Sequence, residues 1–146
     1  SALVELTAVG NENALGFSVN FDWQQWRFTS ATLGADAIGA TLYVNRRLQG
    51  EGRLGMMLAL PAGQTLTAGT RQLVLLQFEA LDSDSQTPSL AFGDWPIARE
   101  VSDAHALVLP TRYQSDEPEP LVPPRQSLPG LPVEGRPGRT EKPRRN

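Results

Sequence analysis

The sequence contains no cysteine, a single histidine and no long apolar run among its 146 residues. Without cysteine the protein has no disulfide, no zinc-thiolate site and no thiol nucleophile. A membrane helix needs about 20 consecutive apolar residues, whereas the longest candidate here, residues 54–61, has the length of a strand. We therefore predict no membrane span. The net charge of -3 gives no electrostatic reason to expect nucleic acid or an anionic membrane as partner.

The composition of the chain changes near Tyr113. Eight of the 12 prolines lie after this residue, where apolar side chains are few. Burying those few side chains does not offset the conformational entropy lost on ordering the segment. We expect one folded domain over residues 1–113 and a disordered tail rich in proline and arginine over residues 114–146. Because the chain starts at Ser1 without a charged and then apolar leader, we interpret it as part of a longer processed protein.

Apolar and polar residues alternate with a period of two through the first 113 residues. The clearest case is residues 15–21, where apolar side chains occupy every second position, as in a strand that buries one face. Further strands are predicted at 4–8, 26–34, 42–44, 54–60, 71–81, 90–92 and 97–101, with a single helical turn at 23–26. Eight or nine short strands with almost no helix predict an all-β fold, an antiparallel β-sandwich of jelly-roll type.

The single histidine, His105, lies close in sequence to a hydroxyl and a carboxylate, Ser102 and Asp103. A serine nucleophile also needs a strained turn that presents it and donors that stabilise the oxyanion. The Gly-x-Ser-x-Gly motif of such a turn does not occur in the sequence. We predict that this group is a solvated loop and that the protein is not an enzyme.

Two pairs of carboxylates would serve glycoside hydrolysis in principle: Asp82 with Asp84, and Glu100 with Asp103. Both pairs lie in polar loop sequence, which lacks the apolar surroundings that raise the pKa of a general acid. The Asp82 segment also lacks the glycine and the later glutamate of a calcium loop. We therefore predict no catalytic residue, no metal and no cofactor.

The order of the strand segments resembles the cohesin family, jelly-roll β-sandwiches of bacterial extracellular proteins. Residues 15–22, 26–34 and 73–78 carry this likeness. Residues 92–104 are similar to a subgroup in environmental bacteria, in which a cohesin-like domain often precedes a dockerin-like segment. Family members usually have a closing strand after the position of Tyr113, where this sequence becomes rich in proline. We therefore expect one sheet edge to be open.

The resemblance implies a non-catalytic module that binds a dockerin-like partner. Its expected setting is the assembly of polysaccharide-degrading or cell-surface complexes, within a larger secreted bacterial protein. No short motif marks the dockerin-contacting residues of cohesins, so none is transferred to this sequence. The partner surface is predicted from the physical character of the side chains.

Four apolar residues are candidates for a partner surface: Met57, Ala59, Leu73 and Leu75. They lie on the second face of two apolar strands, and would form a continuous exposed strip if these strands were neighbours. The favoured alternative is that a loop or the tail covers them, or that they belong to a second core face.

Three aromatic residues outside the strict alternation are candidates for stacking on a sugar ring or for anchoring an interface: Trp23, Tyr43 and Trp95. The favoured alternative is that each closes an end of the sandwich. Direct carbohydrate binding is therefore the second functional hypothesis. A third is a passive spacer or adhesin module whose edge strand pairs with a neighbour.

Overall fold

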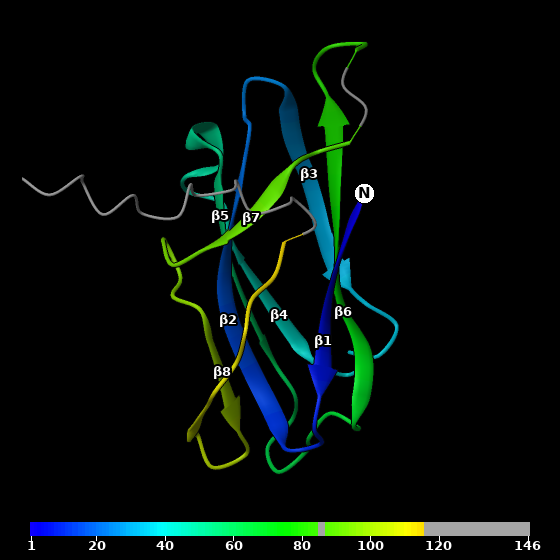
Figure 1. Ribbon diagram of the computed structural model, residues 1–146, viewed down its shortest axis with the longest axis vertical. Coiled ribbons are helices and arrows are strands. Elements are labelled where there is room, and N and C mark those ends of the chain that lie inside the picture. Colours follow the sequence, from blue (N-terminus) through cyan, green and yellow to red (C-terminus); the bar gives the residue numbers. More distant parts are fainter. Residues whose placement is uncertain (85–86, 116–146) are drawn as a thin grey trace, which may run out of the picture.

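The computed structural model describes residues 1–84 and 87–115, which form an antiparallel β-sandwich (Figure 1). Its strands are β1 (Ala2–Ala8), β2 (Glu12–Phe21), β3 (Trp26–Leu33), β4 (Thr41–Asn45), β5 (Arg53–Ala59), β6 (Gly69–Ala80), β7 (Leu90–Gly93), β8 (Glu100–Asp103) and β9 (Val108–Leu109). One 3₁₀ turn, η1 (Gln49–Glu51), precedes β5. The predicted all-β sandwich of eight or nine strands is confirmed.

The strands form two sheets. The smaller sheet has the order β1-β6-β3, and the larger has the order β4-β5-β2-β8-β9, with β7 also paired to β2. Since β5 pairs with one edge of β2, both β7 and β8 share the other edge: β8 pairs with residues 12–16 of β2, and β7 with residues 18–21. The loop of residues 94–99 connects β7 to β8 and therefore starts and ends beside the middle of β2.

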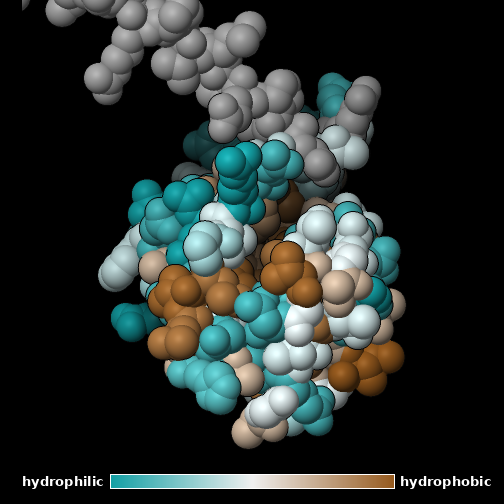
Figure 2. Space-filling model, turned by 60° about the horizontal axis from the view of Figure 1, so that its bottom comes forward, coloured by the Kyte–Doolittle hydropathy of each residue, from teal (hydrophilic) through white to brown (hydrophobic). Residues whose placement is uncertain are grey.

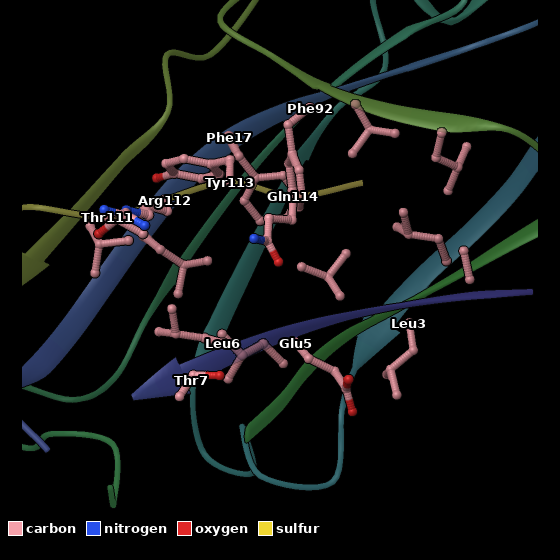
Figure 3. A pocket seen from close by; sticks show the side chains of 18 of the residues that line it. Leu3, Glu5, Leu6, Thr7, Phe17, Phe92, Thr111, Arg112, Tyr113 and Gln114 are labelled. Carbon is pink, nitrogen blue, oxygen red and sulfur yellow. The ribbon is translucent and has the colours of Figure 1, made fainter. Parts of the chain in front are cut away.

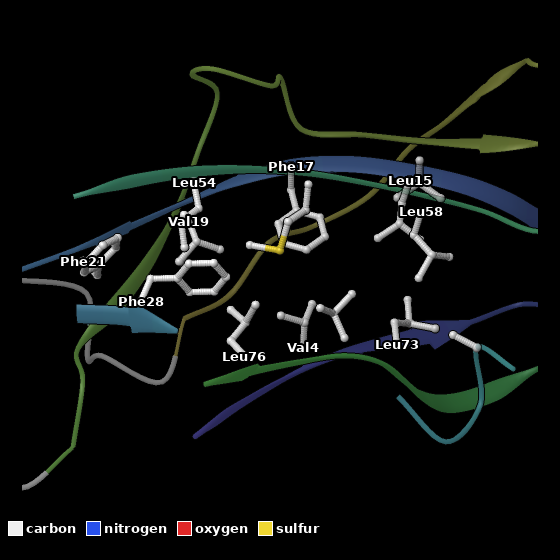
Figure 4. Close-up of a cluster of buried hydrophobic side chains, with 14 of the residues drawn as sticks. Val4, Leu15, Phe17, Val19, Phe21, Phe28, Leu54, Leu58, Leu73 and Leu76 are labelled. Carbon is white, nitrogen blue, oxygen red and sulfur yellow. The ribbon is translucent and has the colours of Figure 1, made fainter. Parts of the chain in front are cut away.

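The core lies between the two sheets and is built by the alternation seen in the sequence. Leu15, Phe17 and Val19 of β2 point toward Leu73 and Leu76 of β6 (Figure 4). Phe17, Leu73 and Leu76 are each at most 1% exposed. Burying a side chain of this size contributes about 1.5–3 kcal/mol, so this cluster is the main source of stability.

The predicted turn before β3 is present, whereas the strand predicted before β8 is not. Residues 22–26 form the predicted single turn, with the backbone N–H groups of Gln25 and Trp26 both donating to the Asp22 carbonyl. The strand predicted at 97–101 is wrong, because β8 begins only at Glu100. Ile97 instead belongs to the loop between β7 and β8 and packs on the larger sheet.

The smaller sheet has β1 at its edge. β6 pairs with one side of β1, and within residues 1–84 and 87–115 no strand pairs with its other side. The closing strand whose absence was expected would fall after Tyr113, mostly outside the described residues, so the expectation of an open edge stays a prediction. The tail predicted to be disordered falls almost entirely on residues 116–146, outside the described residues, so that prediction and the domain boundary at 113 remain predictions.

Candidate functional site

The outer face of the larger sheet carries a row of side chains that alternate with the core. Tyr43 of β4 lies opposite Met57 of β5, and Met57 lies opposite Gly16 of β2. Their sequence neighbours Leu58 and Phe17 point into the core. Tyr43 and Met57 therefore point outward, where they are 57% and 53% exposed.

The loop of residues 94–99 lies on this face and fills the space that two glycines leave. A Cβ atom on Gly55 would be 2.8 Å from Cγ1 of Ile97 and 2.9 Å from Cγ of Pro96. A Cβ atom on Gly16 would be 3.1 Å from Cγ2 of Ile97. Because Met57 is the cross-strand neighbour of Gly16, Ile97 extends the apolar surface that Met57 begins.

We use the name outer patch for Tyr43 and Met57 on the sheet, Pro96 and Ile97 packed beside them, and the adjoining loop residue Trp95. Trp95 precedes Pro96 in the loop and is 64% exposed. Figure 2 shows one face of the molecule, on which apolar residues gather in separate patches among polar ones. Contiguous apolar groups of this kind on a polar surface mark interaction sites more often than single exposed residues do.

Ser18 and the pair of Asp94 and Arg99 hold the loop in place. The buried Ser18 hydroxyl donates to the Ile97 carbonyl at 2.6 Å and accepts the Ile97 backbone N–H at 2.8 Å. Arg99 donates from Nε to Oδ1 of Asp94 and from Nη2 to Oδ2, both at 2.9 Å. The Asp94 carboxylate also accepts the Arg99 backbone N–H at 3.0 Å.

The Arg99 guanidinium has two further effects. Its side-chain hydrogen bonds, with the backbone N–H of the same residue, lower the pKa of Asp94 to about 2. Its Cζ atom also lies 5.3 Å from the centroid of the Tyr113 ring, a cation–π contact. The loop is thereby joined to the segment that follows β9.

A cavity of about 1150 Å³ separates β1 from the segment after β9. Figure 3 shows β1, with Leu3, Glu5 and Leu6, on one side of this space and residues 111–114 on the other. The cavity reaches core side chains such as Phe17, whose ring makes an edge contact with Phe92 at 5.6 Å. Residues 1–84 and 87–115 thus leave the sandwich incompletely filled along its β1 edge.

Tyr113 lines the same cavity and packs edge-on against Phe92, with ring centroids 5.4 Å apart. Its hydroxyl is buried and has no hydrogen-bond partner among the described residues. Burial raises the pKa of this phenol.

The predicted strip of four apolar residues does not form. Met57 and Ala59 belong to β5 in the larger sheet, whereas Leu73 and Leu75 belong to β6 in the smaller one. Leu73 is fully buried between the sheets, as the favoured alternative of a core face proposed. The strands follow one another in the chain but are not neighbours, so of these four residues only Met57 contributes to the outer patch.

The three candidate aromatic residues are all substantially exposed, and none is enclosed at an end of the sandwich. Trp23 is 48% exposed and lies against Gly52, whereas Tyr43 and Trp95 belong to the outer patch. Gly52 immediately precedes β5 and is five residues before Met57, a span of up to roughly 16 Å of extended chain. Trp23 therefore lies away from Met57 and from Tyr43, the cross-strand neighbour of Met57.

The residues considered for catalysis have structural contacts. Asp103 accepts the backbone N–H groups of His105 at 2.8 Å and Leu107 at 2.9 Å, which closes the turn between β8 and β9. These bonds, that of Leu107 first, lower the pKa of Asp103. Within the described part of the chain, no hydrogen bond joins the side chains of Ser102, Asp103 and His105.

Residues 1–84 and 87–115 contain no group of three or more histidine, aspartate or glutamate side chains placed to hold a metal ion. Nor does this part of the chain contain a helix of the length and apolar character needed to cross a membrane.

Sequence reasoning missed the loop of residues 94–99 and its anchor Ser18. A signal was present, because Gly16 and Ser18 on β2 and Gly55 on β5 are small residues at outward-facing positions. Small outward residues on adjacent central strands indicate that something packs on that face. The loop of residues 94–99 packs on this face because of the path that the chain takes after β7, and no local sequence pattern predicts that path.

Comparisons with known proteins give structural likeness only, since no family model and no curated protein matches the sequence. The sixth cohesin of scaffoldin B from Acetivibrio cellulolyticus, in complex with a Cel5 dockerin mutant, has a TM-score of 0.60 and 13% identity over 78% of this chain and 85% of that chain.

Two further solved structures agree with the first. A type I cohesin–dockerin complex from Clostridium thermocellum, of Coh-OlpC with Doc435, has a TM-score of 0.55 and 13% identity, covering 78% of this chain and 81% of that chain. The second type II cohesin module of the ScaA scaffoldin from Acetivibrio cellulolyticus has a TM-score of 0.52 and 12% identity, covering 75% and 78% respectively. By its fold, the chain is a cohesin-like β-sandwich.

Proposed function

We propose that this chain is a non-catalytic recognition module that binds a dockerin-like protein segment through the outer patch. The observation that carries the proposal is the outward row of Tyr43 and Met57, which Pro96 and Ile97 extend by packing over Gly16 and Gly55. Aromatic residues and methionine are enriched in protein interfaces, where they supply most of the binding energy. The similar solved structures include cohesins in complex with dockerins, which supports the choice of partner.

The roles of the acidic residues support a binding module over an enzyme. A general acid at neutral pH needs a raised pKa. The pKa of Asp94 is instead lowered to about 2 by its hydrogen bonds with Arg99, and that of Asp103 is also lowered. Both carboxylates stay ionised and accept hydrogen bonds that hold loops.

The proposed setting is a larger secreted or cell-surface bacterial protein that takes part in assembling polysaccharide-degrading complexes. It rests on the likeness to modules of scaffoldins, such as scaffoldin B and ScaA. In that setting the sandwich is a rigid carrier, and the outer patch is its functional surface.

Titration calorimetry of the 146-residue chain against dockerin-like segments from the same genome tests this proposal. We expect binding to at least one segment and its loss on Met57→Asp, because a carboxylate in a desolvated interface is costly. Leu81→Asp is the matched control, since Leu81 is also 53% exposed but follows β6 of the other sheet. If a folded chain binds no segment in the set, the proposal is wrong.

A second candidate is direct carbohydrate binding, favoured by the exposure of Trp23, Tyr43 and Trp95. Affinity electrophoresis on cellulose, xylan and chitin tests it. Retention that disappears on Trp23→Ala or Trp95→Ala would support sugar stacking. Unretarded migration on all three polysaccharides would exclude it for those ligands.

A third candidate is a spacer or adhesin module in which β1 pairs with a strand of a neighbour. The cavity beside β1 and the position of β1 at its sheet edge favour it. A longer chain that includes the neighbouring segment should then melt at a clearly higher temperature. An unchanged melting temperature would count against strand pairing.

A further inference from the structure

We infer that the loop of residues 94–99 is a pre-organised element that sets the specificity of the outer patch by presenting Trp95 as its anchor. This inference rests on the proposed function and names the part of the surface that distinguishes one partner from another. Trp95 is the most exposed member of the patch, at 64%, compared with 57% for Tyr43 and 53% for Met57, while Pro96 and Ile97 are partly buried.

The first restraint on the loop is Ser18. Its hydroxyl is fully buried and makes two hydrogen bonds to the backbone of Ile97, one as donor and one as acceptor. Both backbone groups of Ile97 are thereby fixed relative to β2. The Ile97 side chain lies over Gly16 and Gly55, so the middle of the loop is held by polar and apolar contacts together.

The second restraint is the pair of Asp94 and Arg99, which joins the two ends of the loop. Three hydrogen bonds of 2.9–3.0 Å connect these residues, two of them from the guanidinium in a bidentate arrangement. Arg99 also lies over the ring of Tyr113. The backbone of Trp95 and Pro96 is thus held on one side by the hydrogen-bonded pair of Asp94 and Arg99 and on the other by the anchored Ile97, while the Trp95 side chain stays exposed.

The physical consequence is a lower entropic cost of binding. Ordering a mobile loop and its side chains at an interface weakens affinity, whereas a loop already held in its bound form avoids that loss. Exposed tryptophan side chains on rigid supports are frequent binding hot spots. The partner that fits is a protein surface with an apolar cleft for the indole ring and a carbonyl or carboxylate that accepts the indole N–H.

The test starts with loop order in the full chain without partner. In Arg99→Ala we expect the heteronuclear NOE values of the Trp95, Ile97 and Ala98 amides to fall, while the melting temperature changes little because Arg99 is on the surface. Arg27→Ala is the matched control, since it removes the exposed ion pair of Arg27 with Glu79 on the smaller sheet. Its loop amides should keep wild-type values.

The second part measures affinity for the dockerin-like segment that the wild-type chain binds. We expect Trp95→Ala to weaken binding about 30-fold or more, the size of a hot-spot loss. Arg99→Ala should weaken it roughly three- to tenfold by restoring the ordering cost. Arg99→Lys should recover part of this loss, since a single ammonium keeps the charge but not the bidentate contact.

The outcomes separate the two proposals. If Trp95→Ala binds like wild type while Met57→Asp does not bind, the inference about the loop is wrong and the proposed function stands. If Arg99→Ala loosens the loop without any loss of affinity, pre-organisation is excluded. If the wild-type chain binds no dockerin-like segment, the proposed function and this inference both fail.

Discussion

Gly55 shows how a single residue controls the outer patch. It lies on a central strand of the larger sheet and leaves room for Pro96 and Ile97, whose atoms lie within 2.9 Å of the position of a Cβ atom. The surface that we assign to partner binding therefore depends on a missing side chain on β5 as much as on the apolar side chains of the loop.

Gly55→Ala is expected to displace the loop of residues 94–99 and to destabilise the protein by about 1–3 kcal/mol, as overpacking usually does. Urea unfolding measures the change. Gly50→Ala is the control, because a Cβ atom there meets no atom within 4 Å. Equal midpoints for the Gly55→Ala variant and wild type would show that the loop is not packed on β5 in solution.

Glu12 is a buried acidic residue at the start of β2, directly after the turn that connects β1 to β2. It is 5% exposed, and its carboxylate accepts the backbone N–H groups of Val9 at 2.7 Å, Gly10 at 3.0 Å and Asn11 at 3.1 Å. Burial acts to raise the pKa of Glu12, but the backbone hydrogen bonds outweigh it, and the pKa is lowered from its ordinary value near 4.5.

Glu12→Gln is expected to destabilise the protein by about 1–3 kcal/mol at pH 7, since both carboxylate oxygens accept backbone N–H groups and the NH2 group of glutamine cannot accept them. A lowered folded-state pKa means that the ionised group stabilises the fold above the unfolded pKa, and that this contribution is lost as the pH falls through the folded pKa. The stability gap between wild type and the variant should therefore shrink below about pH 4.5. Urea titrations at pH 7 and pH 3 measure it, and a constant gap would contradict this assignment.

At the scale of strands, alternation predicted β2 and β5 well because each buries one face against the core. It failed at residues 97–101, where Ile97 is apolar because it packs on glycines of the sheet surface. It also could not show that β5 and β6, consecutive in sequence, lie in different sheets. Strand pairing is set by contacts across the whole chain, so the predicted strip through Leu73 was wrong.

The position of β1 predicts uneven amide protection along the smaller sheet. Amides of β1 that face the cavity should exchange with solvent much faster than amides of β2, which has strands on both sides. Hydrogen exchange followed by NMR measures this difference. Protection of every β1 amide to the level of β2 would mean that another segment or molecule covers the edge.

At the scale of the molecule, the outer patch that we propose for binding lies on the larger sheet, and the described residues leave a cavity along the β1 edge of the smaller one. The fold class followed from the sequence because alternation, turn residues and the scarcity of helix signals all agree. The surface did not, since Tyr43, Met57 and Trp95 come from three separate segments and are brought together only by the pairing of β4 with β5 and the course of one loop.

NMR chemical-shift mapping of the labelled chain with a dockerin-like segment tests the central claim most directly. We predict that the largest chemical-shift changes fall on Tyr43, Met57 and residues 95–97, and that the signals of Trp23 and β1 do not change. Changes confined to Trp23, or to β1 and residues 110–114 beside the cavity, would contradict it and place binding elsewhere on the sandwich.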